Sequence, residues 1–260
     1  MTAVLVGAAG LLGLLVGSFL NVVAHRVPRG ESVVRPPSAC PACGARIRPQ
    51  HNVPVLGWLV LGGRCRDCSA PVSARYPLVE LATGALFAVV AWRTGLSWAL
   101  PALLYLTAIA VVLAVIDVDV HRLPDAIVLP SYAVGGALIA LAAVAAGDPA
   151  ALARAAVGSA ALWLLYFALA VAKPGGMGFG DVKLAGVLGL YLGWLGWAEL
   201  AVGAALGFLL GGVAGVGLLL ARRASRRSAI PFGPFMLAGA LLAVLAGDAL
   251  AGAYLAAVGL

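Results

Sequence analysis

Long apolar runs follow one another along the whole chain, and they restrict its fold more than any other feature. They occupy residues 4–23, 78–92, 101–116, 126–146, 151–172, 182–220 and 230–254. A helix needs about 20 predominantly apolar residues to cross a bilayer. The run at 182–220 is too long for one crossing, and the aromatic stretch at 193–197 within it is typical of a turn at a membrane interface. The sequence therefore predicts an all-α polytopic membrane protein with about eight transmembrane helices.

The charged residues agree with a membrane protein and argue against nucleic acid as a partner. They make up 10% of the chain, and hydrophobic residues make up 63%, whereas soluble domains have about 25% charged residues. The net charge of +7 comes from 17 basic and 10 acidic residues. The basic residues lie in short segments between the apolar runs, as orientation in a membrane requires. We expect them to attract the headgroups of anionic membrane lipids.

The positions of the basic residues also predict the topology. None precedes the first apolar run, and Arg26 and Arg29 follow it. The run is therefore not expected to be a cleavable signal peptide, and the amino terminus is expected outside. Eight crossings place both termini outside and 15 of the 17 basic residues on the cytoplasmic side, with Arg93 and Arg154 as the exceptions. Seven crossings would put the basic cluster at 222–227 outside, so we expect eight crossings of the inner membrane.

Three segments are expected from this pattern. They are a first transmembrane helix at 1–23, a small cytoplasmic domain at 24–77 and a seven-helix membrane domain at 78–260. The middle segment is the only sizeable polar part of the chain, with eight arginines against Glu31 and Asp67. It also contains all four cysteines, which form two C-x-x-C pairs: Cys40 with Cys43, and Cys65 with Cys68.

Two C-x-x-C pairs about 20 residues apart are typical of a tetrahedral zinc site with four thiolate ligands. Another metal or a redox role is less favoured, and disulfides are not expected in a reducing cytosol. Four thiolates leave no open position for a water, so the site is expected to be structural and to stabilise a segment that has little core of its own. His51 lies between the pairs and could replace one ligand, although a solvated loop histidine is the simpler interpretation.

Two aspartates stand at boundaries of apolar runs, where an ionisable group indicates a functional site. Asp117 ends the third run, and Asp181 lies in a glycine-dense stretch before the sixth helix. The predicted topology puts both at the cytoplasmic face, and in an aspartic protease such a pair shares a proton, activates water and polarises the scissile carbonyl. Taken alone, Asp117 is equally consistent with a structural role. Asp119 would point to a nearly opposite helix face, and Asp125 has the position of a helix N-cap.

The residues before Asp181 are expected to bind the substrate. Gly178, Phe179 and Gly180 would let another backbone approach closely, so we expect an extended peptide to add there as a strand. The helix dipoles make a second prediction, because Asp181 begins a helix and Asp117 ends one. Asp181 should stay ionised, and Asp117 should more often be protonated.

Several stretches in this order resemble the type IV prepilin peptidases, a family of membrane aspartic proteases with a G-x-G-D motif. The G-x-G-D motif is at 178–181 of this chain. The other matching stretches are 17–26, the two cysteine pairs, 75–80, 116–119 with 123–125, 178–183 and 230–234. The match covers nearly the whole length. One such motif is weak support, but the ordered set is specific.

The resemblance implies a bifunctional enzyme. Members of the family cut the leader peptide from type IV prepilins and pseudopilins at the cytoplasmic membrane face. Many then methylate the new amino terminus with S-adenosylmethionine, and this activity is associated with the amino-terminal cytoplasmic domain. The catalytic aspartates of the family correspond to Asp117 and Asp181, whereas Asp119 and Asp125 match the pattern without being the catalytic pair.

Two other functions stay open. In a membrane methyltransferase without protease activity, the zinc domain would be the working part. In a non-enzymatic assembly or transport protein, Asp117 and Asp181 would line an ion path. The resemblance does not decide whether the substrate belongs to a pilus, a type II secretion system or a DNA-uptake apparatus.

Overall fold

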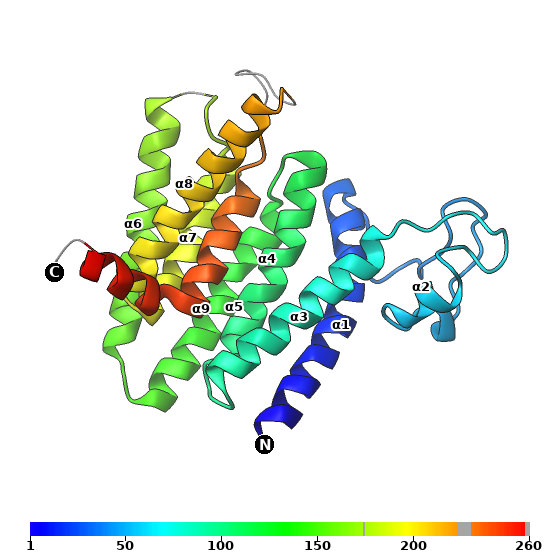
Figure 1. The fold of residues 1–260 in the computed structure, drawn as a ribbon, viewed down its shortest axis with the longest axis horizontal. Coiled ribbons are helices and arrows are strands. Elements are labelled where there is room, and N and C mark those ends of the chain that lie inside the picture. The colour runs from blue at the N-terminus through cyan, green and yellow to red at the C-terminus, as the bar shows by residue number, and fades with distance from the viewer. Residues whose placement is uncertain (174, 223–229, 258–260) are drawn as a thin grey trace. The chain divides into compact units, whose positions relative to one another are not determined.

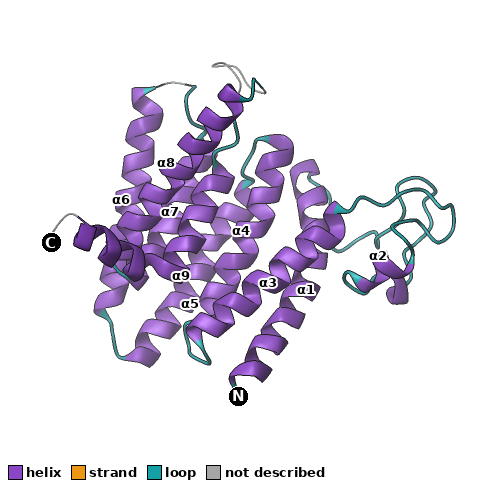
Figure 2. Cartoon of the chain, viewed as in Figure 1, coloured by secondary structure: helices purple, strands orange, loops and turns teal. Residues whose placement is uncertain are grey.

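The computed structural model describes residues 1–173, 175–222 and 230–257 (Figure 1). Residues Arg223, Arg226 and Arg227 of the basic cluster lie outside the described residues. Within them, the regular elements are all helices joined by loops (Figure 2). The predicted all-α class is confirmed.

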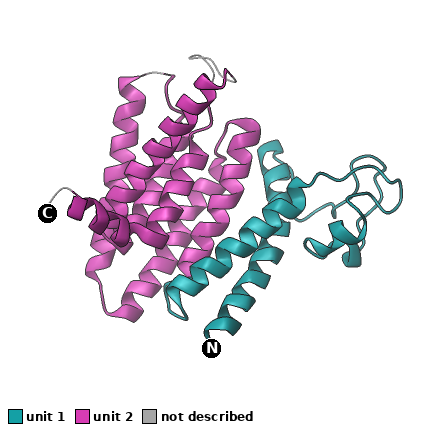
Figure 3. Cartoon of the chain, in the orientation of Figure 1, with its two compact units in different colours: residues 1–100 teal, residues 101–260 magenta. Residues whose placement is uncertain are grey.

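The chain divides into two compact units, residues 1–100 and residues 101–260 (Figure 3). The predicted boundary between residues 77 and 78 does not coincide with this division. The reason is that the helix that follows residue 77 packs against the first helix of the chain. Two apolar helices that are far apart in the sequence thus belong to the same unit as the cysteine pairs.

Unit 1 consists of two long helices with a loop domain between them. Its elements are α1 (Thr2–Arg26), η1 (Val27–Arg29), η2 (Pro49–His51), α2 (Leu56–Val60) and α3 (Arg75–Thr94). Small residues let α1 and α3 approach closely, as is common between membrane helices. A Cβ atom added at Gly17 would lie 2.8 Å from the Cα atom of Glu80, whereas one added at Gly7 would meet nothing within 4 Å. The Asn21 amide also donates to the carbonyl of Tyr76 at 3.1 Å.

Unit 2 is a helical bundle. Its elements are α4 (Leu100–Val120), α5 (Asp125–Ala146), α6 (Ala150–Ala172), α7 (Phe179–Leu195), α8 (Trp197–Leu220) and α9 (Gly233–Ala257). Most residues of α7 from Val182 to Trp194 are buried, because α5, α6, α8 and α9 all pack against it. Glycines bring α6 against α7, since a Cβ atom at Gly158 would lie 2.6 Å from the carbonyl oxygen of Gly189.

Among the residues that the structure describes, seven helices are long and apolar enough to cross a membrane: α1, α3, α4, α5, α6, α8 and α9. The protein is therefore a multi-pass membrane protein. The eighth expected crossing corresponds to α7, which has only 17 residues and so a length of about 25 Å. The break expected within 182–220 is confirmed, because α7 ends at Leu195 and α8 begins at Trp197.

Candidate active site and metal centre

Asp117 lies in the last turn of α4 and is buried. A buried carboxylate needs hydrogen-bond partners to offset the loss of water. One is the backbone N–H of Gly233, the first residue of α9, which donates to Oδ2 of Asp117 at 3.0 Å. The prediction that Asp117 is more often protonated considered the negative dipole end of α4 and did not include this donor. The positive end of α9 also faces this carboxylate, and that favours a negative charge.

Asp181 lies in the first turn of α7, as the sequence predicts. Its Oδ2 atom accepts a hydrogen bond of 3.2 Å from the backbone N–H of Gly178, the residue that precedes the helix. The backbone N–H of Asp181 returns a bond of 3.0 Å to the carbonyl oxygen of Gly178. This reciprocal pair of bonds satisfies groups that a helix start leaves open, and it fixes the orientation of the carboxylate.

The structure brings the two aspartates into one site. They are close enough to interact through their charges. Leu123, in the turn between α4 and α5, packs against Gly180 in the first turn of α7 and against Gly233 at the start of α9. A Cβ atom at Gly180 would lie 3.1 Å from Cβ of Leu123, and one at Gly233 would lie 3.4 Å from its Cδ2. Three segments far apart in the sequence therefore meet around two carboxylates.

The two carboxylates have matching surroundings. In each, a glycine N–H at a helix start holds Oδ2. Aspartic proteases use such pairs because two close carboxylates do not both ionise readily, so one proton is shared. The arrangement can place a water between a carboxylate that accepts a proton and a carboxylic acid that donates one.

The glycine-rich loop is arranged differently from the expectation. Phe179 and Gly180 already belong to the first turn of α7, so their backbone is helical, whereas Gly178 is extended with φ −75° and ψ 146°. Strand addition over all of 178–180 is therefore wrong as a geometry. The ring of Phe179 is exposed, and it stays available to a substrate.

The surroundings of the site include residues whose importance the sequence did not reveal. Asp125 is not the N-cap of α5, which is Pro124; it is the first helical residue, and its carboxylate accepts from Lys183. The ring of Tyr166 in α6 interacts electrostatically with Asp181 and stacks on Phe208, with ring centroids 5.3 Å apart.

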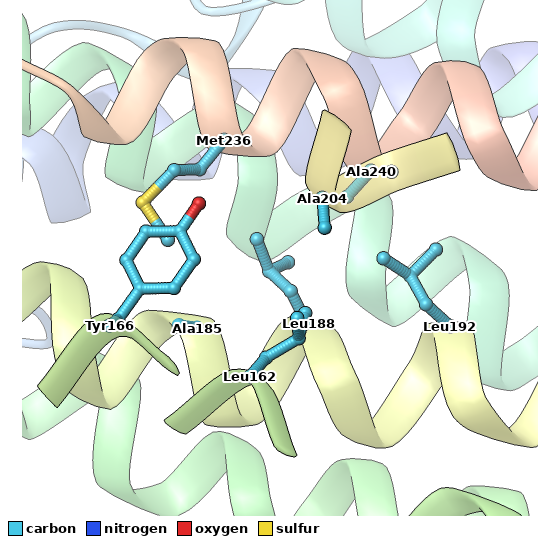
Figure 4. Close-up of a pocket in the computed structure, with 9 residues that line it drawn as sticks. Leu162, Tyr166, Ala185, Leu188, Leu192, Ala204, Met236 and Ala240 are labelled. Atoms are coloured by element: carbon cyan, nitrogen blue, oxygen red, sulfur yellow. The ribbon is translucent and has the colours of Figure 1, made fainter. Parts of the chain in front are cut away.

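A small cavity lies beside Tyr166 among α6, α7, α8 and α9 (Figure 4). It is lined mainly by apolar side chains such as those of Leu162, Leu188 and Met236, and its volume is about 10 Å³. This is about the least space that holds one water, and an apolar lining keeps such a space dry. The cavity is a packing gap and is too small for a peptide side chain.

Unit 1 contains the four cysteines, whose sulfur atoms all lie within 4.8 Å of one another. Among the described residues they form the group that can hold a metal ion, and His51 is not part of it. The Sγ atoms of Cys40 and Cys68 are 3.8 Å apart. This agrees with the separation of about 3.8 Å that Zn–S bonds of about 2.3 Å give in a tetrahedral site.

The two C-x-x-C pairs form equivalent turns. In the first, the N–H of Gly44 donates to the carbonyl of Cys40 at 2.8 Å, and in the second the N–H of Ser69 donates to that of Cys65 at 3.0 Å. Gly44 and Ser69 both have positive φ, 72° and 58°. Backbone N–H groups of Cys43 and Ala42 lower the pKa of the Cys40 thiol to about 7. Such N–H groups favour the thiolate form that a metal needs.

A larger cavity, of about 320 Å³, lies in unit 1 where α1 approaches the loop domain. It is lined by one face of α1, from Leu15 to Arg26, and by loop residues that include Asn52 and Pro54. Next to Pro54, Val55 has φ 61°, which a β-branched residue rarely adopts. The buried carboxylate of Glu80 holds this conformation by accepting from the N–H of Val55 at 2.7 Å. Strained residues of this kind cluster at functional sites.

A multi-pass helical protein with two aspartates from different helices in one site has the architecture of a membrane aspartic peptidase. Comparison with known families is more specific. A model of the type IV leader peptidase family matches residues 104–258, and a model of the bacterial peptidase A24 N-terminal domain matches residues 11–94. The chain belongs to the type IV leader peptidase family. The two matches divide near residue 100, as the two compact units do.

Curated relatives share most of the chain. A prepilin leader peptidase/N-methyltransferase of Pseudomonas aeruginosa is 40% identical over 270 residues, which cover 94% of this chain and 91% of the relative. One of Aeromonas hydrophila is 41% identical over 273 residues, covering 94% and 92%. One of Myxococcus xanthus is 43% identical over 218 residues, covering 81% and 62%. No solved structure matches the chain.

The cysteine cluster gives the first testable prediction. We expect the purified protein to contain about one zinc ion per chain, because four thiolates at these distances suit a tetrahedral ion. Cys43→Ser combined with Cys68→Ser should remove it, whereas Asp67→Asn, in the same loop but without a thiol, should keep it. Metal content is measured by plasma mass spectrometry. Full zinc occupancy in the double variant would contradict the assignment.

Proposed function

We propose that the protein is an aspartic endopeptidase that removes the leader peptide of type IV prepilins or pseudopilins, and that it also N-methylates the new amino terminus. The observation that carries the peptidase part is the meeting of Asp117 and Asp181 from α4 and α7, each held by a glycine N–H. The names of the curated relatives support both activities.

The proposed reaction follows from the two carboxylates. The ionised one takes a proton from a water, and the oxygen of that water attacks the scissile carbonyl carbon. The protonated one gives its proton to the carbonyl oxygen, so a neutral tetrahedral intermediate forms. Its collapse breaks the C–N bond, and the leaving nitrogen takes up the proton that the first carboxylate received. One hydroxyl of the intermediate returns its proton to the second carboxylate as the new carbonyl group forms, which restores the starting protonation of the pair. Because each Oδ2 is already held by a backbone N–H, the Oδ1 atoms are the ones assigned to these transfers.

We place the site at the cytoplasmic face of the inner membrane, with both termini outside. The charge pattern supports this, because eight crossings put 15 of 17 basic residues inside. This count includes α7 as a crossing, which its position inside the bundle allows although it is short. A prepilin would then lie with its apolar helix in the bilayer and its leader in the cytosol. The arginine-rich loop would bind anionic lipids, since it would repel a basic leader.

We assign methylation to unit 1, with S-adenosylmethionine as the donor. The cavity of about 320 Å³ beside α1 supports this assignment, because it lies within the size range of small-molecule sites. Arg26 contributes a charge that suits the donor carboxylate, and Phe19 contributes an aromatic face for its adenine. The metal that the four cysteines would hold has a structural role here. It would fix the loop domain that forms one wall of the cavity.

The peptidase assignment is tested by coexpression with a prepilin and mass spectrometry of its amino terminus. Asp117→Asn and Asp181→Asn should each abolish detectable cleavage, because an amide can neither accept nor donate the proton. Asp119→Asn should cleave normally, since it lies outside the pair. Normal cleavage by either of the first two variants would rule out the proposed mechanism.

Gly233 tests how Asp117 is held. A Cβ atom at this position would lie 2.7 Å from Oδ2 of Asp117, so Gly233→Ala should displace the carboxylate. A displacement of about 1 Å can lower a rate about 100-fold, and we expect kcat to fall about 10-fold or more. Gly212→Ala is the control, because a Cβ atom there meets nothing within 4 Å. Equal rates for the two variants would show that this contact is dispensable.

The methyl-donor assignment has its own test. Ser18 of α1 lines the cavity, so Ser18→Trp should fill it and prevent donor binding. In the coexpression experiment we expect cleaved but unmethylated prepilin, with at least about 10-fold less methylated product. Leu12→Trp, on an exposed part of the same helix, should methylate normally. Full methylation by Ser18→Trp would show that the donor binds elsewhere.

A further inference from the structure

Lys183 and Asp125 form an ion pair beside the two catalytic aspartates. The Nζ atom of Lys183 lies 2.7 Å from Oδ1 and 2.8 Å from Oδ2 of Asp125, so the ammonium group bridges both carboxylate oxygens. The Lys183 side chain is 24% exposed and the Asp125 side chain 56% exposed. The pair is thus partly in contact with water, at the edge of the site.

Each partner belongs to a segment that carries a catalytic carboxylate. Lys183 follows Asp181 by two residues on α7. A contact that holds the Lys183 side chain therefore also restrains the first turn of α7, which positions Asp181. Asp125 is the first residue of α5, directly after the short turn that leaves Asp117 at the end of α4. The ion pair therefore connects the two backbone segments whose separation sets the distance between the carboxylates.

Other contacts join the same segments and act in the same direction. The hydroxyl of Tyr132 in α5 donates to the backbone carbonyl of Lys183 at 2.7 Å. Leu123, in the turn before α5, packs against Gly180. These contacts bring α7 and α5 together, but neither of them involves a charged group. The ion pair supplies the charge-dependent part of this connection.

The ammonium group of Lys183 has a second contact, 5.2 Å from the centre of the Phe179 ring. At this distance an ammonium group and the face of an aromatic ring attract each other in a cation–π interaction. Phe179 is an exposed residue of the first turn of α7, in the segment 178–180 that is expected to bind the substrate. Lys183 thus faces the substrate loop while its backbone belongs to the helix of Asp181.

We propose that Lys183 and Asp125 are positioning residues for peptide cleavage, which hold the starts of α5 and α7 at the spacing that the aspartate pair needs and orient Phe179 for the substrate. This inference rests on the proposed peptidase function. Neither residue touches the reacting atoms, so the effect is on geometry. Both charges are required. It does not matter which of the two segments carries the positive charge and which carries the negative one.

The chain offers a matched control pair. Arg154 and Asp148 are 3.0 Å apart, with side chains 29% and 46% exposed, at the start of α6. This pair resembles Lys183 and Asp125 in distance and exposure, but it does not join the segments of Asp117 and Asp181. A purely structural ion pair would behave alike at both places.

The experiment compares steady-state cleavage of a purified prepilin by the full-length protein in liposomes. Lys183→Met and Asp125→Asn should each lower kcat about 10-fold to 100-fold, as small displacements of catalytic groups do, with smaller changes in KM. Lys183→Arg should keep most of the activity. The exchanged variant Asp125→Lys/Lys183→Asp should recover at least about 10-fold over the single variants. Arg154→Met and Asp148→Asn should stay within about twofold of the unaltered protein.

Two results would overturn the inference. One is a Lys183→Met variant that cleaves with unchanged kcat, and the other is an exchanged variant no better than the single variants although its melting temperature is unchanged. If Lys183→Met does not fold, kcat is compared between Lys183→Arg and the exchanged variant. Activity in both variants supports the inference, and activity in Lys183→Arg alone contradicts it. Failure of the unaltered protein to cleave any prepilin would instead count against the proposed function.

Discussion

Two carboxylates that lie close together at helix ends repel each other and lose contact with water, and the structure around them depends on how this energetic cost is offset. Backbone N–H groups meet part of it. Gly178, directly before α7, holds Asp181, and Gly233, the first residue of α9, holds Asp117. Helix starts are suited to this task, because their first N–H groups lack partners within the helix and carry partial positive charge. Two helix starts therefore converge on the end of α4.

This convergence explains why α7 is short and buried. A helix whose amino end must reach the inside of a bundle is surrounded by other helices. In this bundle α5, α6, α8 and α9 all pack against α7. Close packing by glycines allows it. Gly158 of α6 meets Gly189 of α7 without side chains between them, so the two backbones support each other through contacts that larger residues would prevent. This close packing holds the helix that carries Asp181 against α6.

The sequence was sufficient for features that depend on local pattern. Apolar runs predicted the long helices, the spacing of four cysteines predicted one metal cluster, and a glycine-rich motif singled out Asp181. It was insufficient where distant segments meet. Neither the grouping of α3 with α1 nor the hydrogen bond from Gly233 to Asp117 follows from periodicity or spacing. Reasoning from the dipole of α4 alone gave an incomplete environment for Asp117, because the dominant partner comes from a helix that begins 116 residues later.

The division of the chain into two units is consistent with the order in which the two proposed reactions must occur, hydrolysis first and methylation second. A peptide nitrogen is a poor nucleophile because its lone pair is delocalised into the carbonyl group. A methyl group can therefore be transferred only after hydrolysis has freed the amine. The proposed peptidase in unit 2 thus has to act before the proposed methyltransferase in unit 1, and neither site needs the chemical groups of the other. Two compact units, one with the paired carboxylates and one with the four cysteines, satisfy this order without requiring one pocket to bind both a water and a methyl donor.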